Sequence, residues 1–95
     1  MSETVAVHVL IEGRVQAVGF RFFTKEQAQK LGLTGWVRNT FDGNVEAYAE
    51  GMKEDLEIWL THLHRGPRSA FVTNIKKEWS TPQGKFRYFQ ILPTQ

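Results

Sequence analysis

Cysteine is absent from this chain of 95 residues. Its absence excludes a disulfide framework, a thiolate nucleophile and a metal site built on cysteine. Long hydrophobic runs are also missing, and none approaches the length that a membrane-spanning helix needs. The first residues, MSETVAVHVLIEG, lack the basic start and the apolar stretch of a secretory signal. We therefore expect a cytoplasmic protein with no membrane partner and no thiol chemistry.

An excess of one charge sign is lacking too. The chain has 12 Lys and Arg residues against 10 Asp and Glu residues, a formal net charge of +2. The two signs are interleaved, so the basic patch of a nucleic-acid-binding protein is not present. Hydrophobic residues make up 41% of the chain, which is ordinary for a folded domain. The length predicts one domain over residues 1–95. We expect its ordered core at about 5–92, and we expect a monomer.

Hydrophobic periodicity predicts seven elements along the chain. Val5, Val7, Val9 and Ile11 alternate, which is typical of a strand with one buried face. A helical spacing of apolar residues begins at Phe20 and stops before a glycine, and a second one is followed by Gly-Pro. The pair Asp-Gly in TFDG predicts a hairpin. The expected strands are 5–12, 34–39, 44–51, 69–79 and 85–92, and the expected helices are 20–31 and 53–65.

This order predicts the fold class: α+β, a ferredoxin-like βαββαβ sandwich with an antiparallel sheet, two helices on one face and an extra C-terminal strand. In that fold the third strand lies between the first and the second. The first and second strands then run the same way. The segments that follow Glu12 and Val37 should therefore emerge at the same end of the sheet, where a shared site could form.

The segment GRVQAVGFR, residues 13–21, joins the first strand to the first helix. A helix N-terminus has unpaired N–H groups and a dipole that favour an anion. Gly13 and Gly19 permit backbone angles that turn successive N–H groups inward. Arg21, in the first turn, offers a planar fork that matches phosphate oxygens. These features together favour an oxyanion site, although each alone is compatible with an ordinary turn or a solvated side chain.

Two long motifs resemble the signatures of the acylphosphatases, small enzymes that hydrolyse the carboxyl–phosphate bond of acyl phosphates. GRVQAVGFR is similar to their first signature, and GWVRNTFDGNVEAYAEG, residues 35–51, to their second. The Gly-Pro at 66–67 and the closing FRYFQI also stand where this family has comparable features. The resemblance covers the chain from about Val5 to Leu92, with the motifs in the right order and separation.

The resemblance implies roles for particular residues. Arg21 stands where the family has its catalytic, phosphate-binding arginine, and Asn39 where it has the asparagine that orients the attacking water. The backbone of the preceding loop would cradle the phosphate. Ala17 departs from the family, which often has glycine there, and we expect it to tune affinity. The residues of the expected backbone cradle are Val15, Gln16, Ala17, Val18, Gly19 and Phe20.

The chemistry expected of such a site is simple. An acyl phosphate has a good carboxylate leaving group, so the enzyme must neutralise phosphoryl oxygens and hold a water in line. A guanidinium with N–H donors does the first, and the amide of Asn39 can do the second. We therefore expect no metal and no cofactor. The expected partners are a small-molecule acyl phosphate and inorganic phosphate, the product and a competitive inhibitor, with no nucleic acid.

Other readings of the sequence are weaker. His62 and His64 stand two apart on the second helix, a spacing that suits zinc poorly. RNA-recognition motif domains share the βαββαβ order, but among their stacking aromatics the third strand here offers only Tyr48. A non-catalytic domain that binds an acyl or carbamoyl phosphate within a larger protein is the other alternative. The apparent completeness of the chain and the presence of both Arg21 and Asn39 disfavour it.

Overall fold

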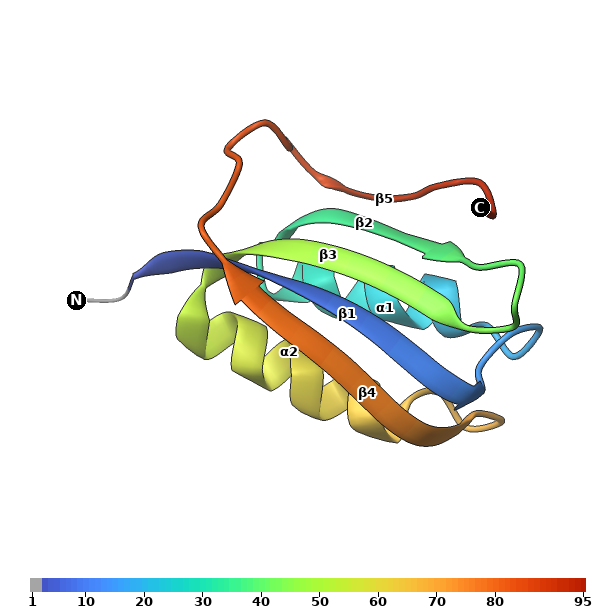
Figure 1. Ribbon diagram of the computed structural model, residues 1–95. Coiled ribbons are helices and arrows are strands. Elements are labelled where there is room, and N and C mark those ends of the chain that lie inside the picture. The colour runs from blue at the N-terminus through green and yellow to red at the C-terminus, as the bar shows by residue number, and fades with distance from the viewer. Residues whose placement is uncertain (1–2) are drawn as a thin grey trace.

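The structure is a computed structural model that describes residues 3–95. It contains five strands and two helices in the order β1, α1, β2, β3, α2, β4 and β5 (Figure 1). Their bounds are β1 Thr4–Arg14, α1 Phe20–Lys30, β2 Thr34–Asn39, β3 Val45–Met52, α2 Lys53–Arg65, β4 Phe71–Ser80 and β5 Phe89–Ile91.

The strands form one sheet in the order β4-β1-β3-β2-β5. As predicted, β3 lies between β1 and β2 and is antiparallel to both, so that β1 and β2 run the same way. The sheet is mixed, however, because β5 pairs with β2 in the parallel direction. The prediction of an antiparallel sheet is thus right for β1 to β4 and wrong for β5.

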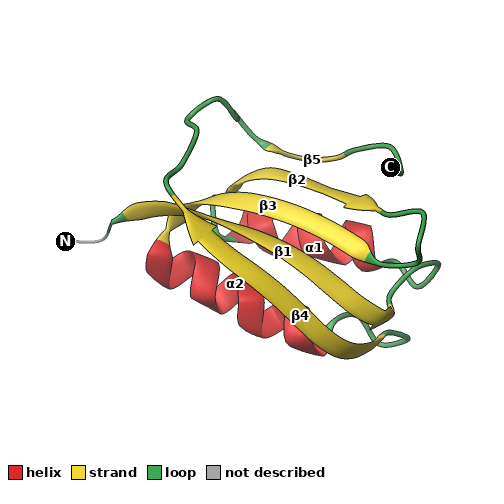
Figure 2. Cartoon of the chain, in the orientation of Figure 1, coloured by secondary structure: helices red, strands yellow, loops and turns green. Residues whose placement is uncertain are grey.

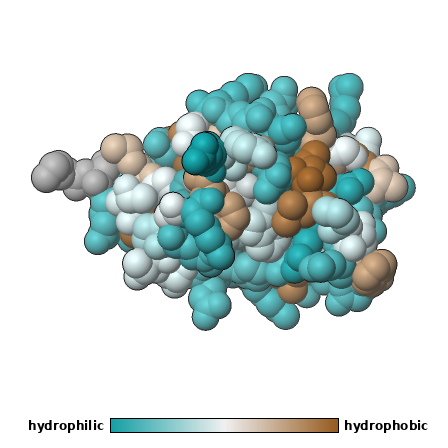
Figure 3. Space-filling model, turned by 90° about the horizontal axis from the view of Figure 1, so that it is seen from above, coloured by the Kyte–Doolittle hydropathy of each residue, from teal (hydrophilic) through white to brown (hydrophobic). Residues whose placement is uncertain are grey.

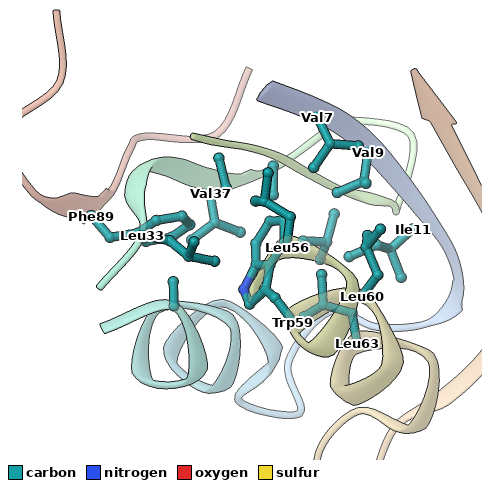
Figure 4. Close-up of a cluster of buried hydrophobic side chains, with 14 of the residues drawn as sticks. Val7, Val9, Ile11, Leu33, Val37, Leu56, Trp59, Leu60, Leu63 and Phe89 are labelled. Carbon is teal, nitrogen blue, oxygen red and sulfur yellow. The ribbon is translucent and has the colours of Figure 1, made fainter. Parts of the chain in front are cut away.

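Both helices cover the same face of the sheet, which leaves the other face open (Figure 2). The core lies between these two layers and is built from the alternating residues of the strands and the inward sides of the helices (Figure 4). At its centre the fully buried Trp59 of α2 meets Phe89 of β5, with ring centroids 5.9 Å apart. Its indole N–H donates to the carbonyl of Thr24 on α1. This one side chain therefore links both helices to the last strand.

Strand β1 continues two residues further than the sequence pattern predicts. Its pairing with β4 shifts register between Glu12 and Gly13, so that Gly13 faces Val72 and Arg14 faces Phe71. A Cβ atom on Gly13 would lie 2.2 Å from the carbonyl oxygen of Phe71. Glycine at position 13 therefore permits the close approach of two strands, and Gly13 belongs to the sheet rather than to the loop that follows.

The C-terminal strand is shorter than predicted, because residues 81–88 pass over the open face of the sheet before β5 begins. The carboxylate of Glu50, which is 6% exposed, accepts hydrogen bonds from the backbone N–H groups of Gln83 and Gly84 and from the hydroxyl of Tyr48. We call residues 81–88 the strap. Within residues 3–95 no helix is long and apolar enough to cross a membrane.

Candidate active site

The loop after β1 and the end of β2 meet at one end of the sheet and form a pocket of about 240 Å³. The topology explains this meeting, since β1 and β2 are parallel and their C-terminal ends lie at the same edge (Figure 1). The structure thus brings together Arg21 and Asn39, the two side chains singled out in the sequence. The pocket is lined by Val15, Ala17, Gly19, Phe20, Arg21, Phe22, Asn39 and Ile91.

The loop at 15–19 alternates in backbone handedness. Ala17 has φ 61° and Gly19 has φ 79°, both left-handed, whereas Val18 between them is not. Alternation of this kind turns successive N–H groups toward one side and forms a concave nest for an anion. Ala17 is the one residue other than glycine with a positive φ in the described part of the chain. The backbone at Ala17 therefore has a conformation that glycine adopts more readily than alanine.

The donors of this loop are unused. The N–H groups of residues 16–22 make no backbone hydrogen bond elsewhere within residues 3–95, and α1 has no side-chain cap at its N-terminus. Arg21 follows in the first turn of α1 and forms no ion pair with a described carboxylate. It is also the pocket's single charged lining residue. Unpaired N–H groups, a helix N-terminus and a free guanidinium make the pocket suited to an oxyanion.

Asn39 ends β2 and reaches the same pocket. Its side-chain oxygen Oδ1 is buried and has no hydrogen-bond partner among the described residues. A buried acceptor without a partner costs about 1–3 kcal/mol, so such a group in a native site calls for a ligand or a water. The amide can both donate and accept, which is the capacity needed to orient a water.

Not every residue of the predicted cradle lines the pocket. Val15 and Phe20 are buried in the core, and each contributes to the wall. Gln16 and Val18 do not line it. Instead, the side-chain amide of Gln16 donates to the carbonyl oxygens of Thr40 and Asn44, at 2.7 and 2.8 Å. We call this pair of bonds the Gln16 brace. It ties the cradle loop to the β2–β3 turn, a role that the loop's own sequence does not reveal.

The C-terminal segment, residues 92–95, is hydrogen-bonded to the backbone of β2 and of the residues around Asn39. The N–H of Gln95 donates to the carbonyl of Asn39, and the N–H of Phe41 donates to the carbonyl of Gln95. The Leu92 N–H bonds to the Val37 carbonyl in the same way. These bonds extend the parallel pairing of β5 along β2 as far as the site. Sequence patterns missed this contact because it joins residues far apart in the chain.

Arg38, the neighbour of Asn39, is engaged outside the pocket. Its guanidinium bonds to Glu46 at 2.8 Å and lies over the ring of Trp36. His8 is also 2.6 Å from Glu46. Although burial acts to raise it, the pKa of Glu46 is lowered from its ordinary value by the hydrogen bonds with His8 and Arg38. Arg38 therefore fixes the end of β2 and leaves Arg21 as the cation of the site.

The RNA-binding alternative finds no support on the open face of the sheet. Tyr48 is 6% exposed, stacks on Trp36 and is covered by Phe86 of the strap. A base could not stack on it without displacing the strap. His62 and His64 lie in the last turn of α2, and within residues 3–95 no three His, Asp or Glu side chains are grouped as a metal site would need.

Fold and pocket together define a ferredoxin-like α+β protein with a site suited to an oxyanion at a strand–helix junction. Residues 7–91 match the acylphosphatase family model. The chain is 46% identical over 90 residues to an acylphosphatase of Trichormus variabilis, covering 95% of this chain and 88% of that protein. The chain therefore belongs to the acylphosphatase family, a family of hydrolases that act on small-molecule acyl phosphates.

Solved structures agree with this assignment. An acylphosphatase from Bacillus subtilis superposes with a TM-score of 0.90 at 35% identity, over 93% of this chain and 98% of that one. T. kodakarensis HypF superposes with a TM-score of 0.81 at 37% identity, over 93% of this chain but 12% of that one. The same fold thus occurs both as a small protein and as a small part of a much larger one.

Proposed function

We propose that Arg21 and the backbone N–H groups of residues 15–20 bind the phosphoryl group of an acyl phosphate, and that Asn39 positions the water that attacks it. The unpaired Oδ1 of Asn39 in the same pocket as the unpaired Arg21 is the observation that supports this division of roles. Inorganic phosphate, the product, would occupy the same cradle and compete with substrate.

The reaction forms one bond and breaks one. The water oxygen attacks phosphorus, the bond between phosphorus and the bridging oxygen breaks, and that oxygen leaves with the electron pair as a carboxylate. The water's proton passes to a phosphoryl oxygen, so the products are a carboxylate and inorganic phosphate. Because the leaving group is already a good one, the protein's task is to position and to neutralise charge.

Arg21 and the nest perform the neutralisation. Their N–H groups are held in place before substrate arrives, so little reorganisation is needed as charge develops on the equatorial oxygens. The oxygen of Asn39 accepts a hydrogen bond from the water and so directs a lone pair toward phosphorus. The Gln16 brace and the C-terminal segment keep the two halves of the pocket at a fixed separation. No step of this scheme requires a metal or a protein base.

The test is turnover of benzoyl phosphate in the presence of EDTA. Arg21→Ala should lower kcat/KM by about 10²–10³-fold, as for the loss of a main oxyanion donor. Arg21→Lys should recover little, because the planar fork is lost. Arg14→Ala is the matched control, since Arg14 is an exposed arginine of the same motif that does not line the pocket.

Asn39→Ala separates the two roles. Its kcat should fall while competitive inhibition by inorganic phosphate stays near the wild-type value. Full turnover in Asn39→Ala would show that the water is positioned by another group. Phosphate binding without turnover in the wild-type protein would favour the non-catalytic alternative.

A further inference from the structure

The carboxylate of Glu46 connects the side chains of three neighbouring strands. Glu46 stands on β3, which lies between β1 and β2. Its Oε1 accepts a hydrogen bond from Nε of Arg38 on β2 at 2.8 Å and lies 2.8 Å from Nη2 of the same guanidinium. Its Oε2 lies 2.6 Å from Nε2 of His8 on β1. Each carboxylate oxygen is therefore engaged with a different neighbouring strand.

The guanidinium of Arg38 is held on its other sides as well. It lies over the ring of Trp36, 4.8 Å from the ring centroid. Its Nη1 donates to the side-chain oxygen of Gln95, and the backbone N–H of Gln95 donates to the carbonyl of Asn39. The side chain of Arg38 and the backbone of Asn39 are thus linked both through the chain and through Gln95.

The Arg38–Glu46 pair is partly shielded from water. Hydrophilic residues cover most of the surface seen from above, around a hydrophobic patch (Figure 3). Arg38 and Glu46 differ from such surface groups, because only 22% and 19% of their side chains are exposed. A partly buried ion pair is screened less by salt than an exposed one, whereas most exposed pairs contribute little. The pair can therefore hold β2 against β3.

The place of this pair in the strand register bears directly on Asn39. Arg38 is paired with Glu46, and Asn39 is paired with Val45 at the end of the same ladder. The ends of elements open more readily than their centres. Successive side chains of a strand point to opposite faces, so Arg38 lies on the open face of the sheet while Asn39 lines the pocket beside α1. A bond between Arg38 and Glu46 consequently restrains the backbone of Asn39 without occupying the pocket.

We propose that Glu46 is a positioning residue: through Arg38 it holds the end of β2 and thereby orients the amide of Asn39 toward the attacking water. This role rests on the proposed function of Asn39. Glu46 does not line the pocket, so it acts on the reaction only through the strand. A misplacement of about 1 Å in a catalytic group can lower the rate by about 10²-fold, so a restraint outside the pocket can set kcat.

The first experiment measures kcat on benzoyl phosphate and the inhibition constant of inorganic phosphate. Glu46→Gln keeps the shape of the side chain and removes its charge, and its kcat should fall about five- to tenfold. The inhibition constant should change by less than about twofold, because Arg21 and the cradle belong to α1 and the loop before it. Arg38→Met, which keeps an aliphatic stem over Trp36, should show the same separation. Lys76→Gln is the matched control, since it breaks the ion pair with Glu12 between β4 and β1, and it should keep the wild-type kcat.

The second experiment places Glu46→Gln in the Asn39→Ala background. If Glu46 acts through Asn39, the double variant should lose no more kcat than Asn39→Ala alone. A merely structural contribution of Glu46 would lower kcat by a similar factor in both backgrounds. Circular dichroism verifies that each variant is folded.

The outcomes separate this inference from the proposed function. A loss of kcat in Glu46→Gln and Arg38→Met that vanishes in the Asn39→Ala background supports the positioning role. Wild-type kcat in either variant, an equal loss of phosphate binding, or a further loss in the double variant would overturn that role and leave Asn39 its own. Full turnover in Asn39→Ala would overturn the proposed function of Asn39 itself, and the role of Glu46 with it.

Discussion

At the scale of single residues, Ala17 is an alanine in a backbone conformation that usually requires glycine. Its φ of 61° lies in the left-handed region, where a residue with a Cβ atom is disfavoured by about 1–2 kcal/mol. Ala17 also lines the pocket, so the strained conformation lies in the wall of the candidate site. The nest therefore exists because the flanking strand and helix impose it, and not because residue 17 prefers it.

Ala17→Gly should raise the free energy of unfolding by about 0.5 kcal/mol. Glycine relieves the left-handed strain, and the greater freedom of the unfolded chain offsets part of that gain. Ala28→Gly is the control, because Ala28 is buried in the interior of α1, where the same change should cost about 1 kcal/mol or more. Urea denaturation of the two variants measures both values. A loss of stability in Ala17→Gly as large as that in Ala28→Gly would rule out strain at position 17.

At the scale of elements, the Gln16 brace connects the cradle loop to the β2–β3 turn that follows Asn39. Gln16→Ala removes both donors and leaves the carbonyls of Thr40 and Asn44 without this partner. The free energy of unfolding should fall by about 1–2 kcal/mol. The KM for benzoyl phosphate should rise several-fold, because the cradle and Asn39 lose their fixed spacing. Gln29→Ala, an exposed glutamine on α1, should change neither quantity, and an unchanged KM in Gln16→Ala would show that the loop holds its own shape.

Tyr48, which lies on β3 beneath the strap, makes the stability of the protein sensitive to alkali. Burial, and then the hydrogen bond to Glu50, raise the pKa of Tyr48 from its ordinary value of 10 to about 12. The unfolded chain loses this proton near pH 10 while the folded protein keeps it. The contribution of the protonated Tyr48 hydroxyl to the free energy of unfolding is thus complete below pH 10 and is lost as the pH rises toward 12.

Tyr48→Phe should therefore show a smaller loss of stability than wild type between pH 10 and 12, by about 2 kcal/mol. Chemical denaturation at several pH values in this window provides the measurement. Tyr88→Phe, which changes a tyrosine that is 64% exposed, is the control and should follow wild type. Identical pH profiles for all three proteins would contradict the role assigned to Tyr48.

The bounds of some helices and strands follow from local sequence signals, whereas those of others depend on contacts between distant residues. The bounds of β2 and α2 agree with the prediction because a hairpin turn and the pair Gly66-Pro67 mark their ends locally. The alternation in KFRYFQIL predicts a strand over 85–92, whereas the bonds from the strap to Glu50 confine β5 to Phe89–Ile91. The Gln16 brace and the place of Ile91 in the pocket likewise depend on contacts between distant residues. No local pattern encodes them.

At the scale of the whole molecule, the strand order brings segments that are distant in the sequence into one pocket. Parallel β1 and β2, separated by β3, deliver the cradle loop and Asn39 to one edge, and this much follows from the element order. The sheet then continues through β5, which carries Ile91 to the same edge. The buried contact between Trp59 and Phe89 anchors that strand to α2. Strand β5 thus contacts both the core, through Phe89, and the pocket, through Ile91.

Because the cradle exists only in the folded chain, a bound anion should stabilise the whole protein. At inorganic phosphate equal to ten times its Kd, the gain in unfolding free energy is about 1.4 kcal/mol, or roughly 5–10 °C in Tm for a domain of this size. Thermal unfolding in phosphate, with potassium chloride at matched ionic strength as reference, measures the shift. Arg21→Ala should abolish most of it, whereas Arg14→Ala should retain it. An equal shift in Arg21→Ala would mean that phosphate acts as a general salt and that the nest around Ala17 and Gly19 is not its site.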